Sequence, residues 1–220
     1  MKLTLIPAQY LEQSIQYPEL SLCRIVSQEK GLYRIISAEG DQLASVSGKF
    51  QHEAASPSDY PVVGDYVMAA LNGGAAVINR VLPRKSLFLR KSVGTARMEQ
   101  AVAANIDTVF ICMSLNSDFN LRRLERYLSV AWESGSLPVV VLTKADLCDN
   151  PAAKAAQATN IAIGADVLVT SSMALDGYNQ ILPYVSQGKT VAFVGSSGVG
   201  KSTLINRLLG EDRQDTGGLR

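Results

Sequence analysis

The sequence is poor in the residues from which metal centres and disulfide frameworks are built. It has 3 cysteines and 1 histidine among 220 residues. The cysteines, Cys23, Cys112 and Cys148, are far apart and show no CxxC spacing, which is typical of buried thiols in a reducing cytosol rather than of disulfides or zinc ligands. The single histidine, His52, falls in a polar stretch between expected strands, and we assign it no catalytic role.

Long apolar runs and an excess of one charge are also absent. No stretch approaches the length of a membrane span, and the apolar run after Met1 is too short for a signal peptide. The formal net charge is +1, so a nucleic-acid partner could be indicated only by local patches. With 47% hydrophobic residues, the chain can form one large domain or two small ones with real cores. We expect a soluble, cytoplasmic protein with no membrane partner. Nothing in the sequence requires more than a monomer.

Residues 1–90 carry short β-type runs separated by turn residues. Five such runs fit a small β-barrel, and we expect the OB-fold, although the pattern also fits an SH3-like barrel. The polar stretch 51–60 is expected to be an irregular loop between strands. The runs cover 21–26, 32–37, 42–47, 66–70 and 75–81.

Positive charge concentrates after the last of these runs. From Arg80 through Arg84 to Arg97 every charged side chain is basic, and the next acid is Glu99. Such a run beside an OB-like barrel favours contact with an RNA backbone, although a solvated basic linker would look the same. We expect residues 91–106 to form this basic linker and a first helix.

From residue 107 to 220, apolar runs alternate with helical patterns. Asn120 can cap a helix to about Glu133, and Asn150-Pro151 opens an alanine-rich helix. A further helix is expected from about 177 to 185. Strands alternating with helices indicate an α/β domain with a mostly parallel sheet. The expected strands cover 108–113, 138–142, 166–169 and 191–194.

The last of these strands leads into a phosphate-binding motif. Gly195–Thr203 contains the pattern G-x-x-x-x-G-K-[ST], the P-loop. Its glycines let successive backbone N–H groups face phosphate oxygens, and the following helix adds the positive end of its dipole. Lys201 is expected to reach the β- and γ-phosphates and the Ser202 hydroxyl to bind Mg²⁺. A glycine- and serine-rich turn could match by chance, but a strand precedes this loop and a helical pattern follows it.

A second loop indicates which base is bound. Thr143-Lys144-Ala145-Asp146 has the form [NT]-K-x-D and directly follows a strand. The Asp146 carboxylate can accept from the two adjacent donors of guanine, a pair that adenine lacks. The aliphatic part of Lys144 can lie across the ring, and Thr143 can tie this loop to the P-loop. Alone, the motif could be a turn in which Asp146 caps the next helix.

A third loop agrees with guanine. Strand 166–169 ends in Thr170-Ser171-Ser172, similar to the GTPase loop in which a backbone N–H meets guanine O6, although an ordinary polar turn would look the same. The loops follow strands, and ligands of parallel α/β sheets bind at that edge. The expected GTP-binding residues are Thr143, Lys144, Ala145, Asp146, Ser171, Ser172, Gly195, Ser196, Ser197, Gly198, Val199, Gly200, Lys201, Ser202 and Thr203.

The order of the loops is unusual, because the base-reading loops precede the P-loop, the reverse of ordinary small GTPases. Circular permutation preserves a packed sheet when the old termini were close and the new break lies in a surface loop. With this order, the chain resembles the ribosome small-subunit-dependent GTPase A family of circularly permuted GTPases. The resemblance spans nearly the whole chain. It rests on Gly64-Asp65-Tyr66-Val67, Leu87–Lys91, Gln100–Asp107, Ser114–Asn120, Thr143–Asp146 and Gly195–Ser202.

The resemblance implies an N-terminal OB domain, a permuted GTPase domain and a C-terminal zinc-binding domain. It implies GTP or GDP with Mg²⁺, a late role in maturing the small (30S) ribosomal subunit, contact with its rRNA, and hydrolysis stimulated by that subunit. In the family, the switch regions and the zinc ligands lie beyond Arg220, so we expect a truncated chain. Asp215-Thr216-Gly217-Gly218 matches D-x-x-G by letter but follows the P-loop helix too closely for switch II. No catalytic residue is assigned.

Two other functions fit parts of the pattern. A nucleotide-gated RNA or protein adaptor would bind GTP without efficient turnover. An ATP-using P-loop enzyme would bind ATP as well as GTP.

Overall fold

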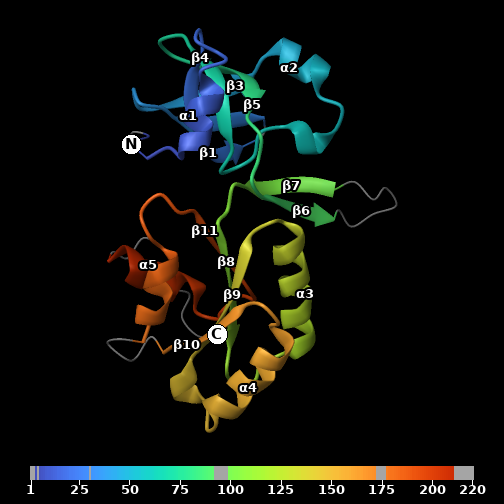
Figure 1. Ribbon diagram of the computed structural model, residues 1–220, viewed down its shortest axis with the longest axis vertical. Coiled ribbons are helices and arrows are strands. Elements are labelled where there is room, and N and C mark those ends of the chain that lie inside the picture. The colour runs from blue at the N-terminus through green and yellow to red at the C-terminus, as the bar shows by residue number, and fades with distance from the viewer. Residues whose placement is uncertain (1–2, 4, 30, 92–98, 172–176, 211–220) are drawn as a thin grey trace. The chain divides into compact units, whose positions relative to one another are not determined.

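The computed structural model divides into two compact units, Met1–Ile106 and Asp107–Arg220 (Figure 1). Each unit has its own hydrophobic core. No helix among the described residues is long and apolar enough to cross a membrane. The described residues are 3, 5–29, 31–91, 99–171 and 177–210.

The first unit is built on a closed barrel with the strand order β1-β2-β3-β5-β4. β1 pairs antiparallel with both β2 and β4, whereas β3 and β5 form a parallel pair. A closed five-stranded barrel of this connectivity is the expected OB-fold, and the expected strands are confirmed. The strands are β1 (Ser21–Glu29), β2 (Leu32–Ile36), β3 (Asp41–Val46), β4 (Tyr66–Leu71) and β5 (Ala76–Val81).

The barrel interior is filled by alternate residues of its strands, as the two-residue period of a strand dictates. Its core contains Cys23 and Ile25 of β1 together with Tyr33 and Ile35 of β2. A second cluster forms outside the barrel where α1 (Ala8–Ser14) packs on β4. There the Tyr10 ring is stacked on Tyr66 with centroids 4.0 Å apart.

The polar stretch 51–60 is more regular than the sequence led us to expect. α2 (Gly48–Glu53) begins at Ser47, whose hydroxyl accepts from the Phe50 N–H at 3.1 Å. The short 3-10 helix η1 (Pro57–Asp59) follows. The expectation of an irregular loop was therefore wrong for much of this stretch, because local capping satisfies the backbone groups that begin each turn.

The expected helix within 91–106 was also wrong for its described part. Residues Glu99–Ala104 form strand β7, which pairs antiparallel with β6 (Leu87–Lys91). Alanine favours helices, but here Ala101 and Ala104 are buried with Val62, so tertiary packing overrides a weak intrinsic preference. Residues 92–98, which include Arg97 of the basic run, lie outside the described part.

Arg84, a member of the predicted RNA-contacting run, is half-buried and hydrogen-bonded within the barrel unit. Its guanidinium donates to the Asp65 carboxylate through Nε at 2.8 Å and Nη2 at 2.7 Å. It also donates to the Ser58 carbonyl at 2.6 Å and the Tyr60 carbonyl at 2.8 Å. Asp65 is fully buried and accepts as well from the Val62 N–H at 2.8 Å. Arg84 therefore fastens the segment before β4 to the barrel, a structural role that the sequence did not indicate.

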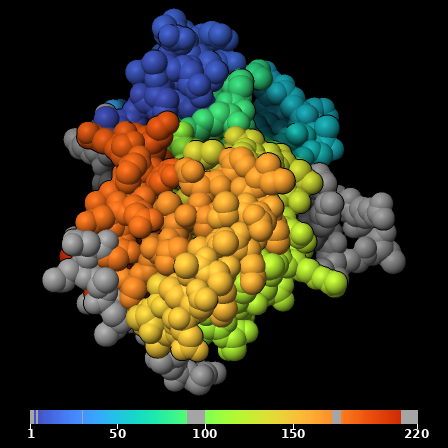
Figure 2. Space-filling model, turned by 60° about the horizontal axis from the view of Figure 1, so that its bottom comes forward, coloured from blue at the N-terminus to red at the C-terminus, as the bar shows by residue number. Residues whose placement is uncertain are grey.

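The second unit is a parallel sheet of the order β10-β9-β8-β11, so the expected α/β fold is confirmed. α3 and α4 lie side by side on one face of the sheet and form much of the surface in Figure 2, whereas α5 covers the other face (Figure 1). The strands are β8 (Thr108–Ser114), β9 (Leu137–Thr143), β10 (Asp166–Val169) and β11 (Val191–Val194). The helices are α3 (Leu121–Glu133), α4 (Pro151–Ile161) and α5 (Lys201–Leu209).

Two shorter helical turns complete this unit. η2 (Ala145–Leu147) follows β9, and η3 (Asn179–Tyr184) occupies the place of the helix expected at 177–185. η3 is a 3-10 helix containing Pro183, a residue that disrupts a regular α-helix. Ile181 of η3 is nevertheless buried against the β8–β9 face, so the segment performs the packing role of the expected helix.

Candidate nucleotide-binding site

The predicted loops meet at one edge of the parallel sheet. Because β9, β10 and β11 all run parallel to the strands beside them, their carboxyl ends lie at the same edge. Residues 143–146, 170–171 and 195–201 leave the sheet there, and they contact one another. Sequence order separates these segments, and the sheet brings them together, as ligand sites of open α/β sheets require.

The P-loop begins with a glycine that no other residue can replace without strain. Gly195 has φ +144°, and a Cβ at this position would lie 2.3 Å from the Cys112 carbonyl oxygen on β8. Gly200, with φ +96°, is the residue from which α5 starts. The two glycines therefore fix where the chain leaves β11 and where its helical N–H groups become available to an anion.

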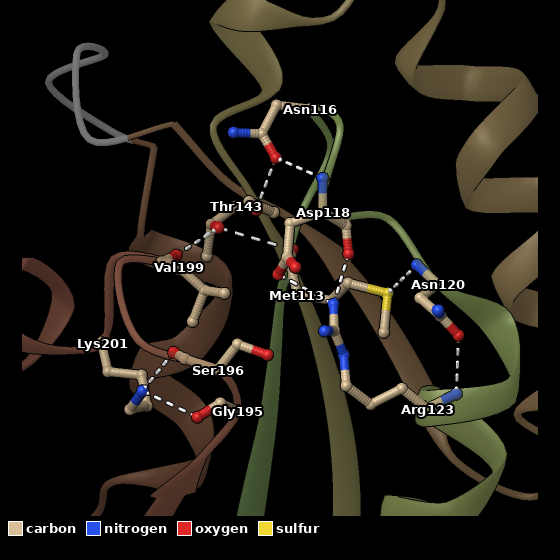
Figure 3. Close-up of polar contacts among 11 residues, drawn as sticks. Met113, Asn116, Asp118, Asn120, Arg123, Thr143, Gly195, Ser196, Val199 and Lys201 are labelled. Carbon is tan, nitrogen blue, oxygen red and sulfur yellow. Dashed lines mark hydrogen bonds and ion pairs between the residues drawn. The ribbon is translucent and has the colours of Figure 1, made fainter. Parts of the chain in front are cut away.

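Lys201, the first residue of α5, turns back over the loop. Its ammonium donates to the Gly195 carbonyl at 2.9 Å and to the Ser196 carbonyl at 2.6 Å (Figure 3). A charge in this place adds to the field of the loop N–H groups and of the helix dipole. Ser202 and Thr203 follow in the first turn of α5 and are half-buried.

Thr143 connects the base-reading loop to the P-loop, as the sequence led us to expect. Its hydroxyl donates to the Val199 carbonyl at 2.6 Å, and the donor and acceptor are 56 residues apart in the chain (Figure 3). Thr143 is 4% exposed, so water competes little for this bond. The contact fixes the two loops relative to each other.

Lys144 and Asp146 are placed by an unusual backbone turn. Lys144 has φ +56°, a left-handed conformation that is uncommon for a residue with a side chain and that concentrates at functional sites. The turn starts η2 and leaves the Asp146 carboxylate exposed, where it accepts from the Ser171 hydroxyl. Ala145 N–H donates to the Thr170 carbonyl at 3.2 Å, so the second and third loops are also bonded through their backbones.

The alternative in which Asp146 caps the next helix is wrong. α4 is capped by Asn150, whose side chain accepts from the Ala153 N–H at 3.0 Å. Asp146 thus keeps an exposed carboxylate at the sheet edge. Ser172 of the third loop lies outside the described residues, as does the Asp215–Gly218 segment.

Sequence reasoning missed the part played by the segment between β8 and α3. We call residues Ser114–Asn120 the β8–α3 loop. They are part of the family resemblance, but the sequence assigned them no function. The loop leaves the sheet at the same edge as the other loops, because Ser114 is paired with Thr143. The Asn120 N–H donates to Met113 Sδ at 3.4 Å, and the Asn120 side chain caps α3 (Figure 3). A conspicuous density of Asn, Asp and Ser after a buried strand was the available signal.

The donor chemistry near the loops fits Mg²⁺ better than a metal that needs a protein cage. Magnesium keeps several waters and is commonly held by few protein atoms together with substrate phosphates, and the half-buried Ser202 hydroxyl in the first turn of α5 is an oxygen donor that fits such a site. Among the described residues, no group of three or more His, Cys, Asp or Glu side chains could hold a metal ion. The implied zinc therefore has no ligand set in the described part of the chain.

The cysteines differ partly from expectation. Cys23 and Cys112 are buried free thiols, and burial raises the pKa of each to about 12, so both are neutral at physiological pH. Cys148 is only half-buried, because it follows η2 at the sheet edge rather than lying in a strand.

Comparisons with known proteins agree with this geometry. The family model for RsgA GTPase matches residues 81–220. The chain is 48% identical over 200 residues to Small ribosomal subunit biogenesis GTPase RsgA 2 of Lactiplantibacillus plantarum, a match that covers 90% of this chain and 56% of that protein. It is 45% identical over 206 residues to Small ribosomal subunit biogenesis GTPase RsgA of Opitutus terrae, covering 89% and 56%.

Solved structures show the same arrangement. The crystal structure of YjeQ from Thermotoga maritima matches with a TM-score of 0.68 and 26% identity over 91% of this chain and 66% of that one. The structure of YloQ, described as a circularly permuted GTPase, matches with a TM-score of 0.64 and 26% identity over 86% and 64%. The chain spans about half the length of the curated relatives it matches, 56% for the two given above.

Proposed function

The chain belongs to the RsgA GTPase family, and from that premise we propose that it binds guanine nucleotides and hydrolyses GTP in the maturation of the small ribosomal subunit. The observation that carries the proposal is the bonded set of loops at one sheet edge. Thr143 bonds the 143–146 loop to the P-loop, and Ser171 of the third loop bonds to Asp146 of the 143–146 loop. Such a set can bind a base and its phosphates at the same time.

We propose the following roles for the P-loop. Backbone N–H groups of Gly195–Thr203 hold the phosphate oxygens, and Lys201 exchanges its carbonyl partners for the β- and γ-phosphates when a nucleotide enters. The Ser202 hydroxyl would hold Mg²⁺, and the ion would supply positive charge that neutralises the phosphates. A loop already bent to this shape by Gly195 loses little conformational entropy on binding.

Guanine specificity is proposed for the other two loops. The Asp146 carboxylate accepts from the N1–H and the exocyclic amine of guanine, Lys144 covers one face of the ring, and Ala145 completes the turn. Ser171 and Ser172 supply backbone N–H groups toward guanine O6, and the Ser171 hydroxyl orients the carboxylate. A site built to pair particular polar groups rejects an analogue that lacks them, up to about 10⁴–10⁵-fold in favourable cases, so ATP is a poor substrate.

The partner is proposed from the family and from the barrel surface. The matched relatives are named small ribosomal subunit biogenesis GTPases. In the barrel unit, the exposed Arg80 of β5 lies over the half-buried Tyr17 ring at 5.8 Å, which places a planar cation beside an aromatic ring at the surface. Such a pair suits contact with rRNA phosphates and bases. We propose a cytoplasmic monomer that contacts rRNA through the barrel.

The test is phosphate release from GTP and from ATP, with and without purified small ribosomal subunits, using the full natural protein. We expect GTP turnover that rises strongly when subunits are added, and little release from ATP. No described residue is assigned to the attacking water, so the stimulated rate is the critical measurement. GTP binding without any stimulation would identify a nucleotide-gated adaptor, and equal release from ATP would refute the guanine assignment.

A further inference from the structure

The β8–α3 loop has a fixed shape that the nucleotide contacts do not explain. The Asn116 side-chain oxygen accepts from the Ser114 hydroxyl at 2.8 Å and from the Asp118 N–H at 3.0 Å. The Asp118 carboxylate forms an ion pair with Arg123 of α3 at 2.8 Å (Figure 3). The loop is therefore tied to itself and to the helix that follows it.

Leu115, the second residue of this loop, is hydrogen-bonded to both ends of the segment that contains Asp146. Its N–H donates to the Thr143 carbonyl at 2.9 Å. Its own carbonyl accepts from the Lys154 ammonium at 2.6 Å. Leu115 is fully buried, so both bonds start from a fixed point. Both ends of the 143–154 segment are thus hydrogen-bonded to Leu115, and Asp146 lies between the two bonded positions.

Lys154 is well placed to act as the second anchor. It lies in the first turn of α4 and is half-buried, and its ammonium is 5.4 Å from the centroid of the Phe119 ring in the β8–α3 loop. A charged donor in a partly shielded position makes a stronger hydrogen bond than a neutral or exposed one, and the aromatic face adds to the attraction. The Asn150 cap transmits this restraint from α4 to the chain that precedes it.

We propose that Lys154 is a positioning residue for guanine recognition, because it holds the returning end of the 143–154 segment and so fixes the Asp146 carboxylate against the base. The inference rests on the proposed role of Asp146. Asp146 itself is exposed, and its carboxylate accepts from the Ser171 hydroxyl on another loop. When the Lys154 anchor is removed, the carboxylate samples more positions and meets the two guanine donors together less often.

The experiment compares the affinities of the full chain for fluorescently labelled GDP and IDP. Hypoxanthine, the base of IDP, lacks the exocyclic amine of guanine. The dissociation constant for IDP divided by that for GDP therefore measures how well Asp146 meets the base. A hydrogen bond to a charged group changes affinity by roughly tenfold to a hundredfold, which sets the ratio expected for the native chain. Lys154→Met, which keeps the apolar stem, should lower that ratio about threefold or more, mainly by weakening GDP.

Matched variants separate positioning from general stability. Gln157→Met changes an exposed residue of the same helix and should leave the ratio unchanged. Lys154→Arg keeps a cation within reach of the Leu115 carbonyl and should restore most of the ratio. Circular dichroism checks the folding of each variant, and if Lys154→Met does not fold, Phe119→Leu replaces it, with a smaller fall in the ratio expected because only the ring contact is lost.

The outcomes are distinguishable. An unchanged ratio in a folded Lys154→Met chain overturns the inference, and so does an equal loss of affinity for both nucleotides, which would mean a purely structural role. If the native chain binds GDP and IDP alike and Asp146→Asn changes neither affinity, the proposed guanine site fails instead.

Discussion

Replacing Arg84 by methionine tests whether this residue fastens the barrel from within. The change removes four hydrogen bonds, two to the Asp65 carboxylate and one each to the Ser58 and Tyr60 carbonyls. Asp65 then remains fully buried without its cation. Removing one partner of a buried pair costs about 3–5 kcal/mol, a large part of the roughly 5–15 kcal/mol that stabilises a typical domain.

The assay is urea unfolding of the full chain followed by far-ultraviolet circular dichroism. Arg80→Met is the matched control, because Arg80 is exposed and makes a ring contact with Tyr17 at 5.8 Å. A surface cation of this kind contributes about 0.5–1 kcal/mol, so its loss should shift the midpoint only slightly. Equal shifts for Arg84→Met and Arg80→Met would refute the internal role and return Arg84 to the candidate RNA contacts.

The same variant has a defined pH dependence. Burial raises the pKa of Asp65, and Arg84 opposes that rise. Without Arg84, burial acts alone and the folded-state pKa rises further above the unfolded value. A group of this kind stabilises the fold below its unfolded pKa and loses that contribution as pH rises through its folded pKa. The stability deficit of Arg84→Met should therefore shrink as pH falls from 7 toward 4. A deficit that is constant over this range would contradict the ionised, buried carboxylate.

Two further predictions concern the nucleotide loops. Gly195→Ala should abolish GDP binding in a folded chain, because the new Cβ would lie 2.3 Å from the Cys112 carbonyl oxygen and the backbone would be held at φ +144°. Fluorescence titration with labelled GDP measures the affinity. A near-native affinity would show that the loop tolerates the side chain. Asp146→Asn should weaken GDP at least tenfold and favour XDP, whose base has a carbonyl where guanine has an amine, since the asparagine amide can donate to it. A competition assay compares the two nucleotides, and unchanged GDP preference would refute the role of Asp146.

The features that the sequence predicted well are those encoded in consecutive residues. The P-loop, the [NT]-K-x-D turn and the buried strands combine a local apolar run with a local turn, and each lies where we expected it. The Thr143 contact with Val199 was also expected, because the roles of the two motifs imply it.

The features that the sequence predicted poorly depend on distant partners. The alanine-rich residues 99–104 look helical until they are paired with β6, and nothing in their own sequence indicates that partner. Arg84 looks like a surface cation until Asp65, 19 residues earlier, is found in contact with it. The Lys154 contact with Leu115 spans 39 residues and joins two segments that carry no shared motif.

The position of β11 in the sheet has a consequence for synthesis of the chain. β11 pairs with β8, and its first partner pair, Val191 with Thr108, joins residues more than eighty positions apart. The ribosome makes about 5–20 residues per second, so the base-reading loops leave the exit tunnel several seconds before the P-loop does. Under the proposed function, GTP contacts all the loops only after β11 has docked beside β8. We therefore expect nucleotide binding to stabilise a sheet that is already assembled rather than to assist the early folding of this unit.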